Sequence, residues 1–109
     1  MKIKKFLLIF ILTFLFSNQI SFADEAKMSK GLEIFNETAG CAGCHVLKAA
    51  GSEGNIGPNL DTVEGLNYDS VMDIVMHGLG VMPAFGEDEI LTKDQIDLVS
   101  FYVANSVGK

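Results

Sequence analysis

Apolar side chains recur at helical spacing in three segments of the chain, which predicts three helices. The first segment, residues 25–39, has its apolar positions at intervals of three or four residues: Met28, Leu32, Phe35 and Ala39. Gly31 lies inside this segment and weakens the helix by about 1 kcal/mol relative to alanine. A glycine there is useful if a second backbone must approach closely.

The second and third segments also carry residues that start and end helices. Asn67 precedes an apolar stripe in residues 68–77 and belongs to the residue types that cap helix N-termini, and Gly78 follows the stripe. Thr92 and Gln95 form a capping box ahead of the third stripe, which runs close to the C-terminus. No alternating run predicts a strand. The glycine-rich residues 46–66 contain no obvious secondary structure, which is unusual in a compact domain.

The first 23 residues follow a different pattern. Three lysines precede an apolar run of 11 residues, 6–16, and Ser21-Phe22-Ala23 ends the following polar stretch. A basic start, a short apolar core and a small-x-Ala site are typical of a secretory signal peptide. A membrane span needs about 20 apolar residues, so a cleaved signal is favoured over a retained anchor. We expect a signal peptide in residues 1–23, one domain in residues 24–109 and a periplasmic location.

The exported domain is small and acidic. Removal of the signal takes three of the eight Lys and Arg residues and none of the 14 Asp and Glu residues, leaving a net charge of −9. Such a chain will not bind nucleic acid by neutralising phosphates, and anionic lipid will not attract it. A domain of this size has a marginal hydrophobic core and commonly needs a disulfide, a metal or a cofactor.

One motif carries chemistry: Cys41-Ala42-Gly43-Cys44-His45. This Cys-x-x-Cys-His spacing indicates covalent attachment of a c-type haem. Positions i, i+3 and i+4 share one face of a helical turn. Both sulfurs can therefore reach the two vinyl groups of one porphyrin edge, with His45 placed to ligate the iron.

Three other readings of the motif compete with haem. A zinc site needs further ligands, and the only other histidine is His77. A thioredoxin-like dithiol is expected beside a βαβ pattern, which the chain lacks. A disulfide between Cys41 and Cys44 leaves His45 unexplained. The combination of export, two cysteines and the adjacent histidine favours haem.

The chain from residue 24 onward resembles the class I c-type cytochromes of the small bacterial kind. The resemblance rests on the Cys41–His45 motif, on Gly57-Pro58-Asn59-Leu60 and on Met82-Pro83-Ala84-Phe85-Gly86, and also on Gly31, Phe35 and Tyr102. It implies an all-α cytochrome c fold, with three main helices and a helical turn wrapped around one covalently bound haem c.

The resemblance also implies roles for single residues. His45 and Met82 would be the axial ligands of the iron. The Pro58 carbonyl would accept a hydrogen bond from His45 and fix its orientation, and Leu60 would pack on the haem, as would Phe85. His77 is a rival ligand to Met82, although a surface position for it is favoured.

The implied function is one-electron transfer between redox proteins, with a dehydrogenase as donor and an oxidase or reductase as acceptor. No nucleophile–base arrangement points to catalysis, so we expect a carrier and not an enzyme. The protein would be a monomer, or a weakly bound haem subunit of a periplasmic dehydrogenase such as a sulfite dehydrogenase. A haem enzyme or gas sensor would need an open iron position, which Met82 would fill.

Overall fold

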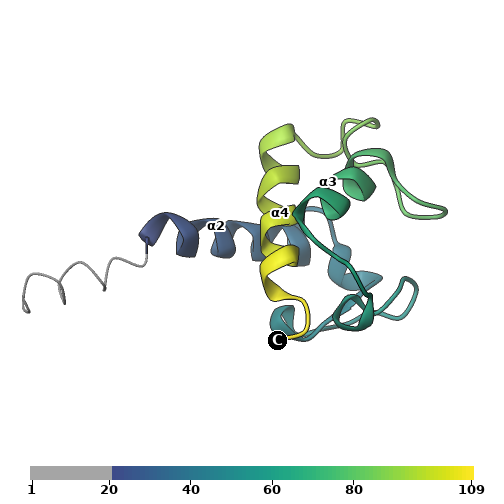
Figure 1. Ribbon diagram of the computed structural model, residues 1–109. Helices are drawn as coiled ribbons and strands as arrows, with labels where there is room; N and C mark the ends of the chain where they lie inside the picture. Colours follow the sequence, from purple (N-terminus) through teal and green to yellow (C-terminus); the bar gives the residue numbers. More distant parts are fainter. Residues whose placement is uncertain (1–20) are drawn as a thin grey trace, which may run out of the picture.

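The computed structural model describes residues 21–109 (Figure 1). Residues 1–20, which hold most of the predicted signal peptide, lie outside the described residues. The all-α fold class is confirmed, because three helices dominate the described part of the chain. These helices are α2 (Phe22–Glu33), α3 (Tyr68–His77) and α4 (Lys93–Ser106). Within residues 21–109, no helix is both long and apolar enough to cross a membrane.

The first helix differs from its predicted bounds. The α-helix α2 begins at Phe22, three residues early, and ends at Glu33, where the π-helical turn η1 (Ile34–Thr38) continues it. The amide of Ala39 donates to the carbonyl of Ile34 over 2.9 Å, a spacing of five residues. A π turn accommodates one extra residue per turn, which side-chain periodicity over such a short stretch does not reveal.

Helices α2 and α4 cross where Gly31 allows close approach (Figure 1). A Cβ atom on Gly31 would lie 2.5 Å from the carbonyl oxygen of Leu98. One turn further along the chain, in η1, the ring of Phe35 packs against that of Tyr102 with centroids 6.0 Å apart and a tilt of 56°. The close approach expected of this glycine is therefore present.

The predicted caps of α3 and α4 are confirmed. The side chain of Asn67 accepts the amide of Ser70, and the Ser70 hydroxyl accepts the amide of Asn67, both over 3.0 Å. Thr92 and Gln95 make the same reciprocal pair at the start of α4. Each cap satisfies two amides that the first helical turn leaves unpaired.

The expectation of no strand and no secondary structure in residues 46–66 was wrong. This segment contains the antiparallel strands β1 (Val46–Leu47) and β2 (Ser52–Glu53), joined by the 3₁₀ turn η3 (Lys48–Ala50), and later the 3₁₀ turn η4 (Leu60–Thr62). Strands of two residues are too short to show an alternating pattern, so the sequence does not reveal them.

The core lies between the helices and receives residues from the loops. Asp61 also fastens the loop segment to the C-terminus, because its carboxylate accepts the amides of Lys48 and Gly108 over 2.9 Å each. The buried apolar residues are Ile34, Phe35, Leu47, Val71, Val75, Phe85, Leu91, Ile96, Val99, Tyr102 and Val103.

Candidate functional site

The predicted helical turn at the cysteine motif is present. Gly40 adopts a left-handed φ of 70° and reverses the chain into the 3₁₀ turn η2 (Cys41–Gly43). The amide of Cys44 then donates to the Cys41 carbonyl over 3.1 Å, and the amide of His45 donates to the same carbonyl over 2.9 Å. These bonds put Cys41, Cys44 and His45 on one turn, as the spacing requires.

The imidazole of His45 is oriented by the loop that follows β2. Its Nδ1 lies 2.7 Å from the carbonyl oxygen of Pro58. A carbonyl oxygen only accepts, so Nδ1 carries a proton, and Nε2 is the ring nitrogen left to ligate a metal. The amide of Gly57 donates to the Cys44 carbonyl over 2.7 Å, which holds this loop against the turn.

Gly57 itself packs against the His45 ring. A Cβ atom at this position would lie 2.5 Å from Cε1 and 2.9 Å from Nδ1 of His45. The absence of a side chain at Gly57 is therefore what lets the loop reach the imidazole. The sequence motif Gly-Pro-x-Leu contains this glycine, but the contact could not be inferred from the sequence.

Ser52 is a site residue that sequence reasoning missed. It is buried, and its hydroxyl donates to the backbone carbonyl of His45 over 2.8 Å. The same oxygen accepts the amide of Leu47 over 2.9 Å. Ser52 thus fixes the backbone of His45, while Pro58 fixes its ring. No motif marks a serine in a glycine-rich loop for this role.

Met82 lies in a tight turn between α3 and α4. The turn is closed by an antiparallel bridge, in which Leu79 donates to the Met82 carbonyl over 3.2 Å and accepts the Met82 amide over 3.0 Å. Gly78, with a φ of 74°, starts the turn, and a Cβ atom on it would lie 2.7 Å from the Met82 carbonyl oxygen. The backbone at Met82 is therefore well fixed.

The remaining predicted residues are placed by packing. Leu60 starts the turn η4 and, like Met82, is half-buried against the hydrophobic core. Phe85 is buried within that core. A hydrogen bond joins the side chain of His45 to Pro58, whereas the side chains of Leu60 and Met82 pack against the core.

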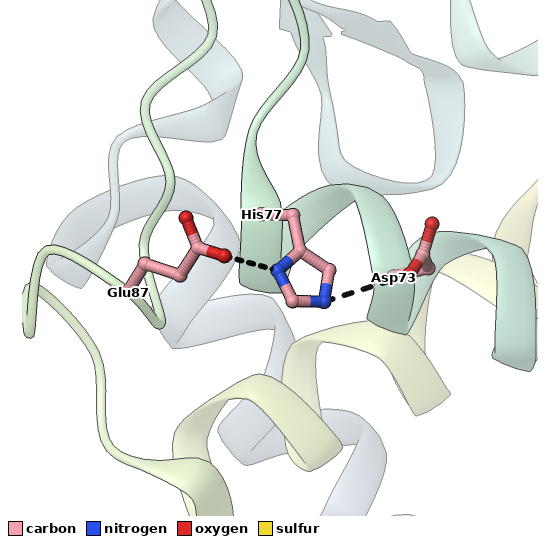
Figure 2. Close-up of polar contacts among 3 residues, drawn as sticks. All are labelled: Asp73, His77 and Glu87. Carbon is pink, nitrogen blue, oxygen red and sulfur yellow. Dashed lines mark hydrogen bonds and ion pairs between the residues drawn. The ribbon is translucent and has the colours of Figure 1, made fainter.

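Both ring nitrogens of His77 face carboxylates, as Figure 2 shows. Nδ1 lies 2.5 Å from Oε1 of Glu87, and Nε2 lies 3.7 Å from Oδ1 of Asp73. The hydrogen bond with Glu87 raises the pKa of His77, and the charges of Glu87 and Asp73 act in the same direction. A ring engaged in this way does not offer a free nitrogen to a metal, which argues against His77 as an iron ligand.

The donor set of the site fits covalent haem better than zinc or a reactive dithiol. Both cysteine thiols are free, and burial raises the pKa of Cys41 to about 11. A protonated thiol is a poor redox nucleophile. In residues 21–109, no cluster of three or more His, Cys, Asp or Glu side chains is placed to hold a metal ion. An imidazole held at Nδ1 by Pro58, beside two free thiols, is the set that haem c requires.

Known proteins match this chain over most of the described domain. The family described as cytochrome c oxidase, cbb3-type, subunit III matches residues 26–103. A cbb3-type cytochrome c oxidase subunit CcoP of Azospirillum sp. (strain B510) is 33% identical over 96 residues, which cover 75% of this chain and 31% of CcoP. The chain thus spans about a third of the length of that relative.

A solved structure is also similar. The c-type cytochrome SorU from Sinorhizobium meliloti is 41% identical and superposes with a TM-score of 0.70, covering 78% of this chain and 95% of SorU. The chain therefore belongs to the cbb3-type cytochrome c oxidase subunit III family, and it is a small class I c-type cytochrome with covalently bound haem c.

Proposed function

We propose that this protein is a periplasmic one-electron carrier that exchanges electrons with other redox proteins and converts no small molecule. The observation that carries this proposal is the orientation of His45, whose Nδ1 is held by the Pro58 carbonyl over 2.7 Å. That bond leaves Nε2 free as a strong, fixed ligand. Family membership makes haem-based electron transfer the activity; the carrier role and the periplasmic location are the proposal.

In this proposal His45 and Met82 would hold the iron, and Cys41 and Cys44 would hold the haem through thioethers. Bound haem c supplies an iron that alternates between Fe(II) and Fe(III). Pro58 and Ser52 keep His45 in one position, and the Leu79–Met82 bridge keeps the thioether loop in one conformation. Two ligands that stay in place leave no open position for substrate, which supports a carrier over an enzyme.

The ligand assignment is tested with carbon monoxide. Replacing Met82 with alanine should open the iron and allow fast binding of CO to the reduced protein. Replacing His77 with alanine should leave the low-spin spectrum intact. If the second replacement removed the low-spin spectrum and the first did not, Met82 would not be the ligand.

The export step is tested on the native protein. Cleavage after Ala23 should give a mature chain that begins with Asp24. This position lies in the first turn of α2, where Phe22 is 89% exposed and residues 21–27 are all exposed. N-terminal sequencing that returned an uncleaved chain from membranes would contradict the proposal.

A second candidate is a haem subunit held within a larger redox complex, such as a periplasmic dehydrogenase. The CcoP relative favours it, because its name describes a subunit of an oxidase.

Stopped-flow kinetics separate the two candidates. Electron-transfer encounters bury little surface, below roughly 1,200 Å², so a carrier meets its partner by diffusion. Its rate should depend on protein concentration, and salt should slow its reaction with a basic partner. A bound subunit would transfer electrons at a rate independent of both. Fast peroxide turnover by the isolated protein would contradict both candidates.

A further inference from the structure

The loop that carries Met82 is joined at its two ends. It comprises residues 78–86, so His77 directly precedes it and Glu87 directly follows it. The imidazole Nδ1 and the carboxylate Oε1 of these two residues lie 2.5 Å apart. Beside them, the amide of Glu87 donates to the carbonyl of Met76 over 3.1 Å. Figure 2 shows the side-chain contact bridging from the end of α3 to the returning chain.

The interior of the loop is already ordered by short-range contacts. The Leu79–Met82 bridge closes its tip, and Gly86 packs directly against Met76, where a Cβ atom would overlap the sulfur. What these contacts leave free is a swing of the whole loop about its two ends. The burial of Phe85 in the core and the contacts between the two ends of the loop resist that motion.

The charges around His77 favour its protonated form. Glu87 faces it from the loop end, Asp73 faces it from the preceding turn of α3, and Asp88 lines the same surface hollow. His77 also sits at the C-terminus of α3, where the helix dipole favours a cation. A protonated imidazole gives a charge-assisted bond to Glu87, which is stronger than a neutral one.

We propose that His77 and Glu87 are positioning residues that clasp the ends of the loop 78–86 and thereby hold Met82 in place for axial ligation. This proposal rests on the assignment of Met82 as a ligand. This contact, called the His77–Glu87 clasp below, changes how often the loop opens and leaves Met82 as the ligand. The resting low-spin spectrum should therefore survive its removal.

The sign of the pH dependence follows from the contact. The pKa of His77 is raised in the folded protein, mainly by the hydrogen bond with Glu87. The charge-assisted clasp is therefore complete at low pH and weakens as pH rises through that pKa. His77 is 54% exposed and Glu87 is 58% exposed, so solvent screens the pair and the effect is modest.

The test measures the rate at which CO binds to the reduced holoprotein, because CO enters only when Met82 leaves. CO carries no titratable group, so its rate reports on the protein alone at every pH. Glu87→Gln should raise this rate about two- to fivefold at neutral pH, as expected for an exposed ion pair. Asp73→Asn is the matched control: it removes the carboxylate that faces the other ring nitrogen of His77, Nε2, and does not bridge the loop, so the rate should change less than twofold.

A second readout is the pKa of His77 measured by NMR in the reduced protein, where His45 is the only other histidine. In the wild type, the CO rate should rise with pH across that pKa, and the step should disappear in Glu87→Gln and in His77→Gln. Equal CO rates in the wild type and Glu87→Gln across the pH range would overturn the clasp. So would a larger effect of Asp73→Asn than of Glu87→Gln.

The failure of the clasp and the failure of the proposed ligation give different results. If Met82 is not a ligand, the Met82→Ala protein binds CO no faster than the wild type. If Met82 is a ligand and the clasp is wrong, Met82→Ala opens the iron while Glu87→Gln changes nothing.

Discussion

Replacing Gly57 with alanine should displace the imidazole of His45. The new Cβ atom would lie 2.5 Å from Cε1, 2.9 Å from Nδ1 and 3.0 Å from Nε2 of that ring. Ordinary carbon–carbon contacts lie at about 3.5–4.0 Å, so the ring or the loop must move by about 1 Å. The ring cannot move freely, because Pro58 holds Nδ1 and Ser52 holds the His45 carbonyl.

The loss of stability caused by Gly57→Ala can be expressed as a shift in the midpoint of thermal unfolding. Inserting a methyl group into a well-packed site costs about 1–3 kcal/mol. For a domain of this size, each kcal/mol lowers the midpoint of thermal unfolding by about 4–8 °C. Gly57→Ala should therefore lower that midpoint by about 5–20 °C. The weakened His45–Pro58 bond should also shift the reduction potential, because the partner of a ligating histidine tunes the metal.

The measurement is thermal unfolding of the holoprotein, followed by the Soret band and paired with potentiometry. Gly43→Ala is the matched control, because it lies in the neighbouring Cys41–His45 motif, has no positive φ and would place its Cβ atom more than 4 Å from any protein atom outside its chain neighbours. Its unfolding midpoint and potential should match the wild type. If Gly57→Ala behaved like Gly43→Ala, the argument that this glycine exists to admit His45 would be refuted.

Three further predictions concern the rest of the domain. Acid–acetone extraction should leave the pigment on the wild-type polypeptide, and replacing both Cys41 and Cys44 with alanine should give an unfolded or molten apo chain. Gly31→Ala should destabilise the protein by about 1–3 kcal/mol in denaturant, although alanine favours helices by about 1 kcal/mol, whereas the exposed Ser29→Ala should be nearly neutral. Hydrogen bonds from the amides of Lys48 and Gly108 lower the pKa of Asp61, so its stabilisation is present at neutral pH and is lost as pH falls through that pKa. The stability difference between the wild type and Asp61→Asn should therefore shrink in acid.

The parts of the fold that could be predicted from the sequence depend on local signals. The caps at Asn67 and Thr92 involve residues three positions apart, and the cysteine motif spans five residues. Their local structure therefore depends on neighbouring residues that the sequence shows together. The sequence predicted part of the crossing of α2 and α4: a glycine destabilises a helix, so Gly31 indicated that a second backbone approaches closely there.

The parts that could not be predicted depend on contacts across loops. Ser52 reaches the carbonyl of His45 only because the two-residue strands β1 and β2 pair. His77 meets Glu87 ten residues away only because the Met82 loop returns to the end of α3. Side chains of these types are common in loops, and nothing in their spacing selects one partner over another.

The π turn η1 sets the length of chain between the helix crossing and the cysteine motif. Upstream of it, Gly31 is packed against α4; downstream, Cys41 begins the turn that carries the cysteines. Each residue of a helix advances the chain by about 100° around the axis. A π turn holds one residue more than an α-helical turn, so deleting one residue from 34–38 would convert η1 into an ordinary α-helical turn and keep the cysteines close to their orientation relative to the helix crossing. A second deletion would rotate them by about 100°. Natural variation in length among related chains should therefore be limited to one residue in this segment and be larger in the loops after His45.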